Sequence, residues 1–225
     1  MKTESDKVEL PLKWKTPDSW AESAMSDVIA LLDDHAHLEK KAATNAMDLI
    51  NRWPQPEPPI GWVTTLASIA RDETDHLFKV SKLMAQRGHQ LSRFHTSEYA
   101  AALRPLVRMG KGWNELVDRL LVSALIELRS CERFEILGRL CQDEVLQKLY
   151  KALWGSEHNH YKVFLKLARS LPKAAREDKE AITKRQVIVD QRWEQLLQFE
   201  ADIMQERRKL YEWVLEPLIS ITGKL

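Results

Sequence analysis

The sequence predicts an all-α protein built on a four-helix bundle. Glycine is scarce, with 7 among 225 residues, and the long segments are rich in Leu, Ala, Glu, Lys and Arg, which favour helix over strand. Apolar residues in these segments recur with the helical period. Prolines break the pattern between residues 51 and 59 and again at Pro105 and Pro172. The chain is therefore expected to fold as long helices joined by irregular connections.

Start and stop signals delimit the expected helices. We predict the four long bundle helices over residues 26–50, 61–87, 114–141 and 143–170. Residues 1–25 are expected to form an N-terminal arm that includes a short turn of helix from Thr16-Pro17-Asp18, with Leu10, Leu12 and Trp14 holding the arm to the body. Residues 171–225 are expected to form a charged additional helix over 175–206 and an apolar tail without a predicted position.

The connections predict the topology. Helices one and two are joined by a short connection, as are helices three and four, so each pair is expected to form an antiparallel hairpin. The 88–113 segment between the pairs is long enough to cross over the bundle, and it contains a predicted short helix over 97–103. One long crossover between two helical hairpins is typical of ferritin-like bundles. We therefore predict one ferritin-like domain over residues 1–225, with 26–170 as its bundle.

Composition excludes several classes of protein. Lys and Arg number 34 against 33 Asp and Glu, so the chain is not a globally basic nucleic-acid binder. Cys131 and Cys141 are ten residues apart on one predicted helix, about 15 Å along its axis, which is too far for a disulfide. The sequence contains no apolar run long enough for a membrane span and no signal-peptide core near its start, so we expect a cytoplasmic protein.

The spacing Glu-x-x-His occurs twice, as Glu73–His76 and as Glu157–His160. Each pair lies near the middle of a long predicted helix, where residues three apart share a face. The rest of each face is apolar: Leu66 and Ile69 precede the first pair, and Tyr150 and Leu153 precede the second. Buried carboxylates and imidazoles cost several kcal/mol each unless they are paired or bound to a metal. The pattern therefore predicts metal ligands.

The other two bundle helices offer the remaining ligands, Glu39 and Glu127, on their own apolar stripes. Glu127 follows Glu39 by 88 residues, and the second Glu-x-x-His follows the first by 84. This near-repeat indicates two related hairpins facing each other around a pseudo-two-fold axis. Four carboxylates and two histidines on four helices are typical of di-iron or di-manganese proteins.

Other residues compete for these roles. His35 and His37 are interpreted as exposed residues or as residues that support ligands from behind. Glu132 and Glu135 are available on the third helix, but Glu127 is preferred because Ser123, Ala124, Ser130 and Cys131 around it are small and leave room for a metal, dioxygen and substrate. Glu132 is expected to form a salt bridge with Arg129 or Arg133.

Four segments carry a resemblance to a known family. The stretches His37–Ala43 and Ile69–His76, and above all Leu128-Arg-Ser-Cys-Glu-Arg-Phe134, resemble the tRNA-modifying hydroxylases of the MiaE family, as does Ser156–His160. The resemblance extends over about residues 28–204 and departs at Leu128, where Ala would be expected.

The resemblance implies a function. Members of the family hydroxylate the isopentenyl group of 2-methylthio-N6-isopentenyladenosine at position 37 of tRNA. Membership would imply two iron ions, dioxygen as co-substrate and electrons from an external donor such as a reductase or ferredoxin. We expect a monomer or small homo-oligomer with tRNA as its partner. Alternatives are an iron-oxidising or storage ferritin, a different di-iron oxygenase, and a helical adaptor without metal.

The crossover is locally basic. From Arg87 to Gly112, five cations against the single acid Glu98 leave a charge of +4, in a chain that is nearly neutral overall. Such a segment can follow a phosphate backbone, whereas an ordinary solvated loop is the alternative. The residues expected to contact tRNA are Arg87, Arg93, Arg104, Arg108 and Lys111.

Overall fold

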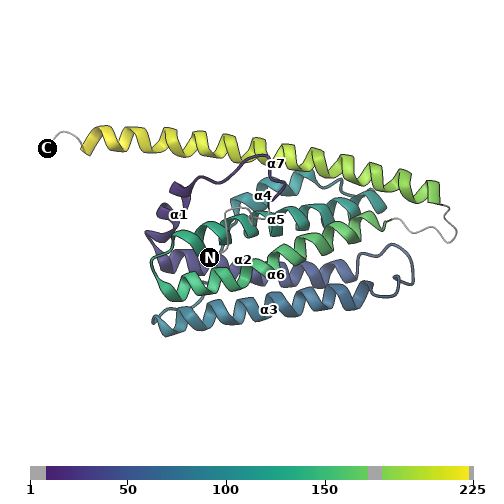
Figure 1. Cartoon of the computed structure of the whole chain (residues 1–225), viewed down its shortest axis with the longest axis horizontal. Coiled ribbons are helices and arrows are strands. Elements are labelled where there is room, and N and C mark those ends of the chain that lie inside the picture. The colour runs from purple at the N-terminus through teal and green to yellow at the C-terminus, as the bar shows by residue number, and fades with distance from the viewer. Residues whose placement is uncertain (1–8, 172–178, 223–225) are drawn as a thin grey trace.

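The bundle has the predicted helices in the predicted topology. A computed structural model describes residues 9–171 and 179–222, within which every regular element is helical. The four bundle helices are α2 (Val28–Ile50), α3 (Trp62–Gln86), α5 (Trp113–Leu140) and α6 (Glu144–Arg169). Helices α2 and α3 pack along each other as one hairpin, and α5 and α6 form the other (Figure 1).

Local signals account for the helix ends. The Asp27 side chain accepts a hydrogen bond from the Ala30 amide and caps α2, and Asp143 caps α6 through the amides of Val145 and Leu146. Beyond the end of α3, Gly88 has a φ of 78°, a left-handed conformation that residues with a Cβ rarely adopt. Capping and this glycine thus place the bundle helices within one or two residues of the predicted bounds.

The crossover runs the length of the bundle. At its start, Arg87 forms an ion pair of 2.6 Å with Asp143, where α6 begins. At its end, the Trp113 ring lies 4.9 Å from the ring of Trp53, in the connection between α2 and α3. Between these points lie the short helix α4 (Glu98–Leu103) and the 3-10 turn Arg104–Leu106. The crossover therefore joins opposite ends of the two hairpins, as predicted.

The additional helix differs from the prediction in length. Helix α7 spans Lys179–Thr222, whereas the sequence interpretation ended it at Glu206; the predicted start at residue 175 lies outside the described residues. Between Lys179 and Thr222 the chain contains no glycine, and the helix continues through Pro217 and ends before Gly223. Figure 1 shows α7 along one side of the bundle, with its C-terminal part extending beyond α1.

The N-terminal arm attaches as predicted. Helix α1 spans Asp18–Met25, Leu12 is buried in the core and Leu10 packs against it. The Arg129 guanidinium lies 5.5 Å from the centroid of the Trp14 ring. Residues 1–8 lie outside the described part of the chain.

The bundle interior consists of two apolar clusters. One contains Ala46, Leu66, Leu120 and Phe164, and the other contains Leu32, Val80, Leu137 and Tyr150, together with their neighbours. On α2, α3 and α6 the predicted metal ligands lie between the two clusters, whereas Glu127 of α5 lies within the first cluster, between Ala124 and Leu128. Apolar packing therefore flanks the site on both sides.

Two apolar residues near helix ends are exposed. Met47 is 53% exposed and Val63 is 44% exposed, whereas Ala46, Leu49 and Trp62 are buried in the core. No helix in the described residues is long and apolar enough to cross a membrane.

Candidate metal centre

The structure brings all six predicted ligands into the middle of the bundle. Each of the four bundle helices contributes to the set, and every member is buried, with relative exposures between 0 and 5%. The residues are Glu39 on α2, Glu73 and His76 on α3, Glu127 on α5, and Glu157 and His160 on α6. Charged and polar side chains are seldom this buried without partners, so the cluster is a functional candidate on burial alone.

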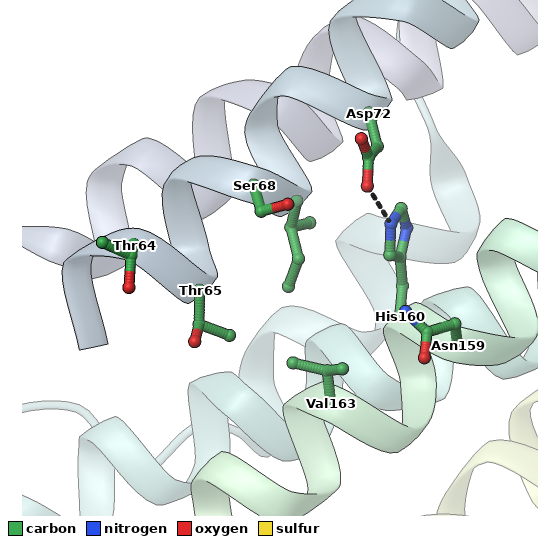
Figure 2. A pocket seen from close by; sticks show the side chains of 8 residues that line it. Thr64, Thr65, Ser68, Asp72, Asn159, His160 and Val163 are labelled. Carbon is green, nitrogen blue, oxygen red and sulfur yellow. Dashed lines mark ion pairs between the residues drawn. The ribbon is translucent and has the colours of Figure 1, made fainter. Parts of the chain in front are cut away.

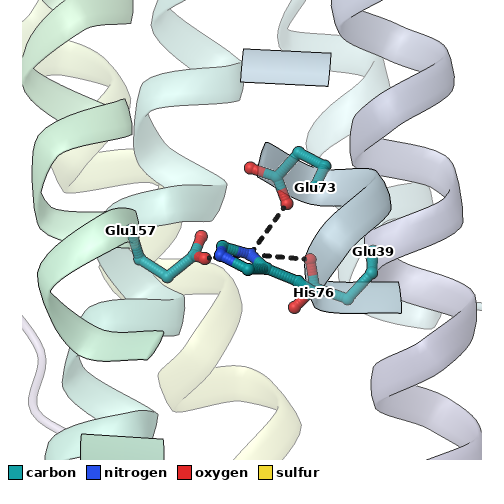
Figure 3. A group of neighbouring side chains, drawn as sticks. All are labelled: Glu39, Glu73, His76 and Glu157. Atoms are coloured by element: carbon teal, nitrogen blue, oxygen red, sulfur yellow. Dashed lines mark ion pairs between the residues drawn. The ribbon is translucent and has the colours of Figure 1, made fainter. Parts of the chain in front are cut away.

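The six residues form two overlapping groups. In each group of four, one ligand atom per residue lies within 4.8 Å of all the others. The first group is Glu39, Glu73, His76 and Glu157, drawn in Figure 3. The second is Glu73, Glu127, Glu157 and His160. Since Glu73 and Glu157 belong to both groups, the arrangement suits two adjacent metal ions bridged by these carboxylates.

The close contacts between these groups are not ordinary hydrogen bonds. His76 Nδ1 lies 3.1 Å from Glu157, 3.5 Å from Glu39 and 3.6 Å from Glu73, and His160 Nδ1 lies 2.6 Å from Glu73. Yet both Glu73 oxygens, one Glu157 oxygen and both Nδ1 atoms lack a partner with hydrogen-bond geometry among the described residues. Buried polar atoms without partners are costly. Metal ions at the shared centres would satisfy them, so this donor set fits a metal site.

Burial and mutual repulsion control the protonation of the metal-free cluster. Burial, together with the neighbouring carboxylates, raises the pKa of Glu39 and of Glu127 well above the usual range. Burial alone would lower the pKa of His76, but the surrounding carboxylates, Glu157 first, raise it to about 12. Burial likewise opposes ionisation of Glu73, yet the imidazoles of His160 and His76 hold its pKa below the usual range. The metal-free site therefore retains protons that metal binding has to displace.

Comparison with known proteins identifies the family. The family model described as tRNA-(MS[2]IO[6]A)-hydroxylase (MiaE) matches residues 3–212. The chain belongs to the MiaE family. It is 41% identical over 155 residues to a tRNA 2-(methylsulfanyl)-N(6)-isopentenyladenosine(37) hydroxylase from Pseudomonas putida, an alignment that covers 69% of this chain and 73% of that protein.

A second relative agrees with this assignment, and a solved structure agrees with the fold. The hydroxylase of the same name from Salmonella typhimurium is 32% identical over 140 residues, which cover 61% of this chain and about half (49%) of that longer protein. A solved Synechococcus protein with aldehyde deformylating oxygenase activity superposes with a TM-score of 0.68 at 30% identity, covering 84% of this chain and 89% of that one. The fold of this MiaE-family chain is the predicted ferritin-like bundle.

His35 supports a predicted ligand. Its Nε2 lies 2.6 Å from Glu39 Oε1, and its ring lies 5.0 Å from that of Phe134 and 5.6 Å from that of Tyr150. Burial lowers the pKa of His35 to about 4, so the imidazole is neutral. When Glu39 is ionised as a metal ligand its carboxylate can only accept, so the neutral His35 would then donate from Nε2. The structure agrees with the interpretation of His35 as a residue that supports a ligand through a hydrogen bond. The other interpretation, that His35 and His37 are exposed, is wrong for both residues.

Sequence reasoning missed Asp72. His160 Nε2 lies 3.5 Å from Asp72 Oδ2 (Figure 2). Its Nδ1 is turned towards the cluster, and Ser156 Oγ lies 3.4 Å from Nε2. A carboxylate behind a metal-binding histidine sets its orientation and tautomer. The only sequence signal was an acid directly before Glu73. Asp72 and the outer edge of His160 line a pocket of about 310 Å³ between α3 and α6, whose other residues are Thr64, Thr65, Ser68, Ile69, Asn159 and Val163.

The two rivals of Glu127 on α5 lie away from the cluster. Glu132 accepts hydrogen bonds from the Arg129 side chain and from the Thr16 amide and hydroxyl, which confirms the predicted ion pair with Arg129. Arg129 also pairs at 2.7 Å with Glu200 on α7. Glu135 is largely exposed beside Arg139. The buried network of Arg129 with Glu132, Thr16 and Glu200 therefore fastens the N-terminal arm and α7 to the bundle.

The five predicted tRNA contacts fall into two sets. Arg87 pairs with Asp143, and Arg108 pairs with Asp118, so both guanidiniums hold parts of the protein together. Arg93, Arg104 and Lys111 are exposed and form no ion pair with the described residues. The free positive charge of the crossover is therefore smaller than the sequence predicted.

Proposed function

We propose that the chain uses two iron ions, dioxygen and electrons from an external donor to hydroxylate the isopentenyl group of 2-methylthio-N6-isopentenyladenosine at position 37 of tRNA. Family membership supports the reaction and the substrate. The observation that carries the metal proposal is the pair of overlapping ligand groups sharing Glu73 and Glu157. Iron is favoured because the reaction requires redox chemistry, which zinc, magnesium and calcium do not supply.

The proposed ligands divide naturally between the two ions. Glu39 and His76 would bind one ion, Glu127 and His160 the other, and Glu73 and Glu157 would bridge them. When bound, two ferrous ions supply the activation of dioxygen that hydroxylation of a C–H bond needs. One oxygen atom enters the substrate, and the other leaves as water with two electrons from the donor and two protons.

The chain's own residues provide position and exclusion of water. The carboxylates neutralise the positive charge of the metal, and His35 and Asp72 orient one ligand on each half of the site. The apolar clusters on either side of the ligands keep water from the reacting atoms. We further propose that the exposed cations Arg93, Arg104 and Lys111 contact the tRNA backbone.

Nucleoside analysis tests the proposal. Cells lacking the gene should accumulate the isopentenyl nucleoside in their tRNA and lose its hydroxylated form, measured by mass spectrometry. Complementation with the wild-type gene should restore the hydroxylated form. The His160→Ala variant should not, whereas Glu135→Ala, which removes an exposed carboxyl group from α5, should restore it fully. Unchanged tRNA in the deletion strain would refute the function.

A further inference from the structure

Part of the crossover is fastened to α2 at the level of the metal centre. The amide of Ser92 donates to Asp33 at 2.7 Å, and His37 Nε2 donates to the Ser92 carbonyl at 3.1 Å. His37 is two residues from Glu39 on the same helix, so Ser92 is held beside the turn of α2 that bears this ligand.

The other end of this short segment is held in the same way. His95 Nε2 donates to Asp34 at 2.7 Å, and Lys41 Nζ donates to His95 Nδ1, also at 2.7 Å. The rings of His37 and His95 stack at 4.7 Å with an interplanar angle of 5°. Residues 92–95 are thus held at both ends, and the carboxylates of Asp33 and Asp34 are already engaged.

Between these anchors, Phe94 points into solvent. Its relative exposure is 81%, although both neighbouring anchors lie against α2. The guanidinium of Arg93 lies 5.1 Å from the centroid of the Phe94 ring. Lys40, exposed on the adjacent turn of α2, adds positive charge, and it forms no ion pair with the described residues. The result is an aromatic face with a cation over it on a firmly held segment.

We propose that Phe94 is a stacking platform for an unpaired base of the substrate tRNA, with Arg93 contacting an adjacent phosphate. This inference rests on the proposed function. Proteins recognise single-stranded RNA by stacking bases on aromatic rings and arginine planes beside cations that contact the backbone. An enzyme with a buried site has to take its target base out of the stack, which leaves a neighbouring base without a stacking partner. Phe94 offers such a partner at the level of Glu39.

Binding measurements on the full-length, iron-loaded protein test the platform. The probe is tRNA carrying the isopentenyl modification, titrated at several salt concentrations. Phe94→Ala should weaken binding about 5- to 150-fold, the loss of one stacked base, without changing the salt dependence. Phe94→Trp should retain wild-type affinity. Arg93→Gln should instead lower the slope of log K against log salt by about 0.7, the loss of one phosphate contact.

Phe78 supplies the matched control, because it is a phenylalanine 63% exposed on α3, outside the crossover. Phe78→Ala should bind tRNA like the wild type, and all variants should keep full iron content. The platform is excluded if Phe94→Ala binds as tightly as the wild type, or if Phe78→Ala loses as much affinity. It is also excluded if Phe94→Ala changes only the amount of electron-donor protein needed, which would indicate a protein-docking surface.

The same experiment separates this inference from the proposed function. If the wild-type protein hydroxylates tRNA and Phe94→Ala binds tRNA with unchanged affinity, only the stacking platform is refuted. A wild-type protein that neither binds nor hydroxylates tRNA refutes both.

Discussion

Replacing Glu127 by Gln should abolish metal binding without destabilising the metal-free protein. Glu127 is 5% exposed, and burial among carboxylates raises its pKa well above the usual range, so its side chain is protonated and neutral before metal binds. Glu127→Gln therefore exchanges one neutral group for another of about the same size, and the stability of the metal-free fold should change little. The substitution removes a charged oxygen ligand from the group formed with Glu73, Glu157 and His160.

The magnitude follows from linkage. A ligand at 100 times its dissociation constant stabilises the native state by about 2.7 kcal/mol. For a chain of 225 residues, each kcal/mol moves the melting temperature by roughly 2–4 °C, so saturating ferrous iron should raise the wild-type Tm by about 5–11 °C. Glu127→Gln should lose most of this rise.

Glu132→Gln is the control on the same helix. This change weakens the hydrogen bonds from Arg129 and Thr16 and should lower the stability of the metal-free protein by about 1–3 kcal/mol, yet keep the full rise with iron. The assay is anaerobic calorimetry with and without ferrous iron, together with elemental analysis. If Glu127→Gln keeps two irons and the full increase in Tm, or if the two variants exchange behaviour, the ligand assignment on α5 is wrong.

Three further outcomes are expected. Metal binding should release protons, because the pKa values of Glu39, Glu127 and His76 are all raised in the metal-free chain. The apparent affinity for the metal should therefore fall as the pH is lowered. Calorimetry in two buffers of different ionisation enthalpy measures the released protons, and finding none would contradict this prediction. Asp72→Asn should weaken iron binding about 10- to 100-fold by disturbing His160, whereas the exposed Asp75→Asn on the same helix should not, as equilibrium competition with a chelator measures. Neutralising Arg93, Arg104 and Lys111 together should reduce the slope of log K against log salt for tRNA binding by about 2. Oxidation of a free isopentenyl nucleoside by the same variant is the control and should be unchanged. An unchanged slope would show that these three residues do not contact the tRNA.

Helical periodicity was sufficient to predict the bundle and to bring the six candidate ligands together. Residues three apart on a helix share a face wherever the helix packs, so Glu73 and His76 had to point the same way. The choice of Glu127 over Glu132 followed from the size of the neighbouring side chains. Of these two residues, the structure places Glu127 in the cluster and Glu132 away from it.

Contacts between distant segments were beyond this kind of reasoning. Arg108 counted as a free cation in the sequence, yet it pairs with the fully buried Asp118 ten residues away, and Arg192 of α7 joins the same carboxylate. Asp72 looked like an ordinary surface acid on α3 until the fold placed it behind His160 of α6. Such roles depend on which helices become neighbours, which periodicity alone does not specify.

The repeat in the sequence predicts a symmetrical site, but the surroundings of the two lone glutamates differ. The counterpart of His35, shifted by 88 residues, is Ser123. His35 donates to Glu39, whereas the Ser123 hydroxyl donates to the Arg119 carbonyl and accepts from Asn45.

Glu39 is therefore the constrained carboxylate, and we expect Glu127 to change its metal coordination between the reduced and oxidised forms. Structures of the metal-loaded protein in the two forms test this: Glu39 should keep its contact with His35 in both, while the Glu127 carboxylate shifts. In His35→Leu both glutamates should shift. A Glu39 that moves as much as Glu127 in the wild type would show that the hydrogen bond from His35 does not distinguish the two halves of the site.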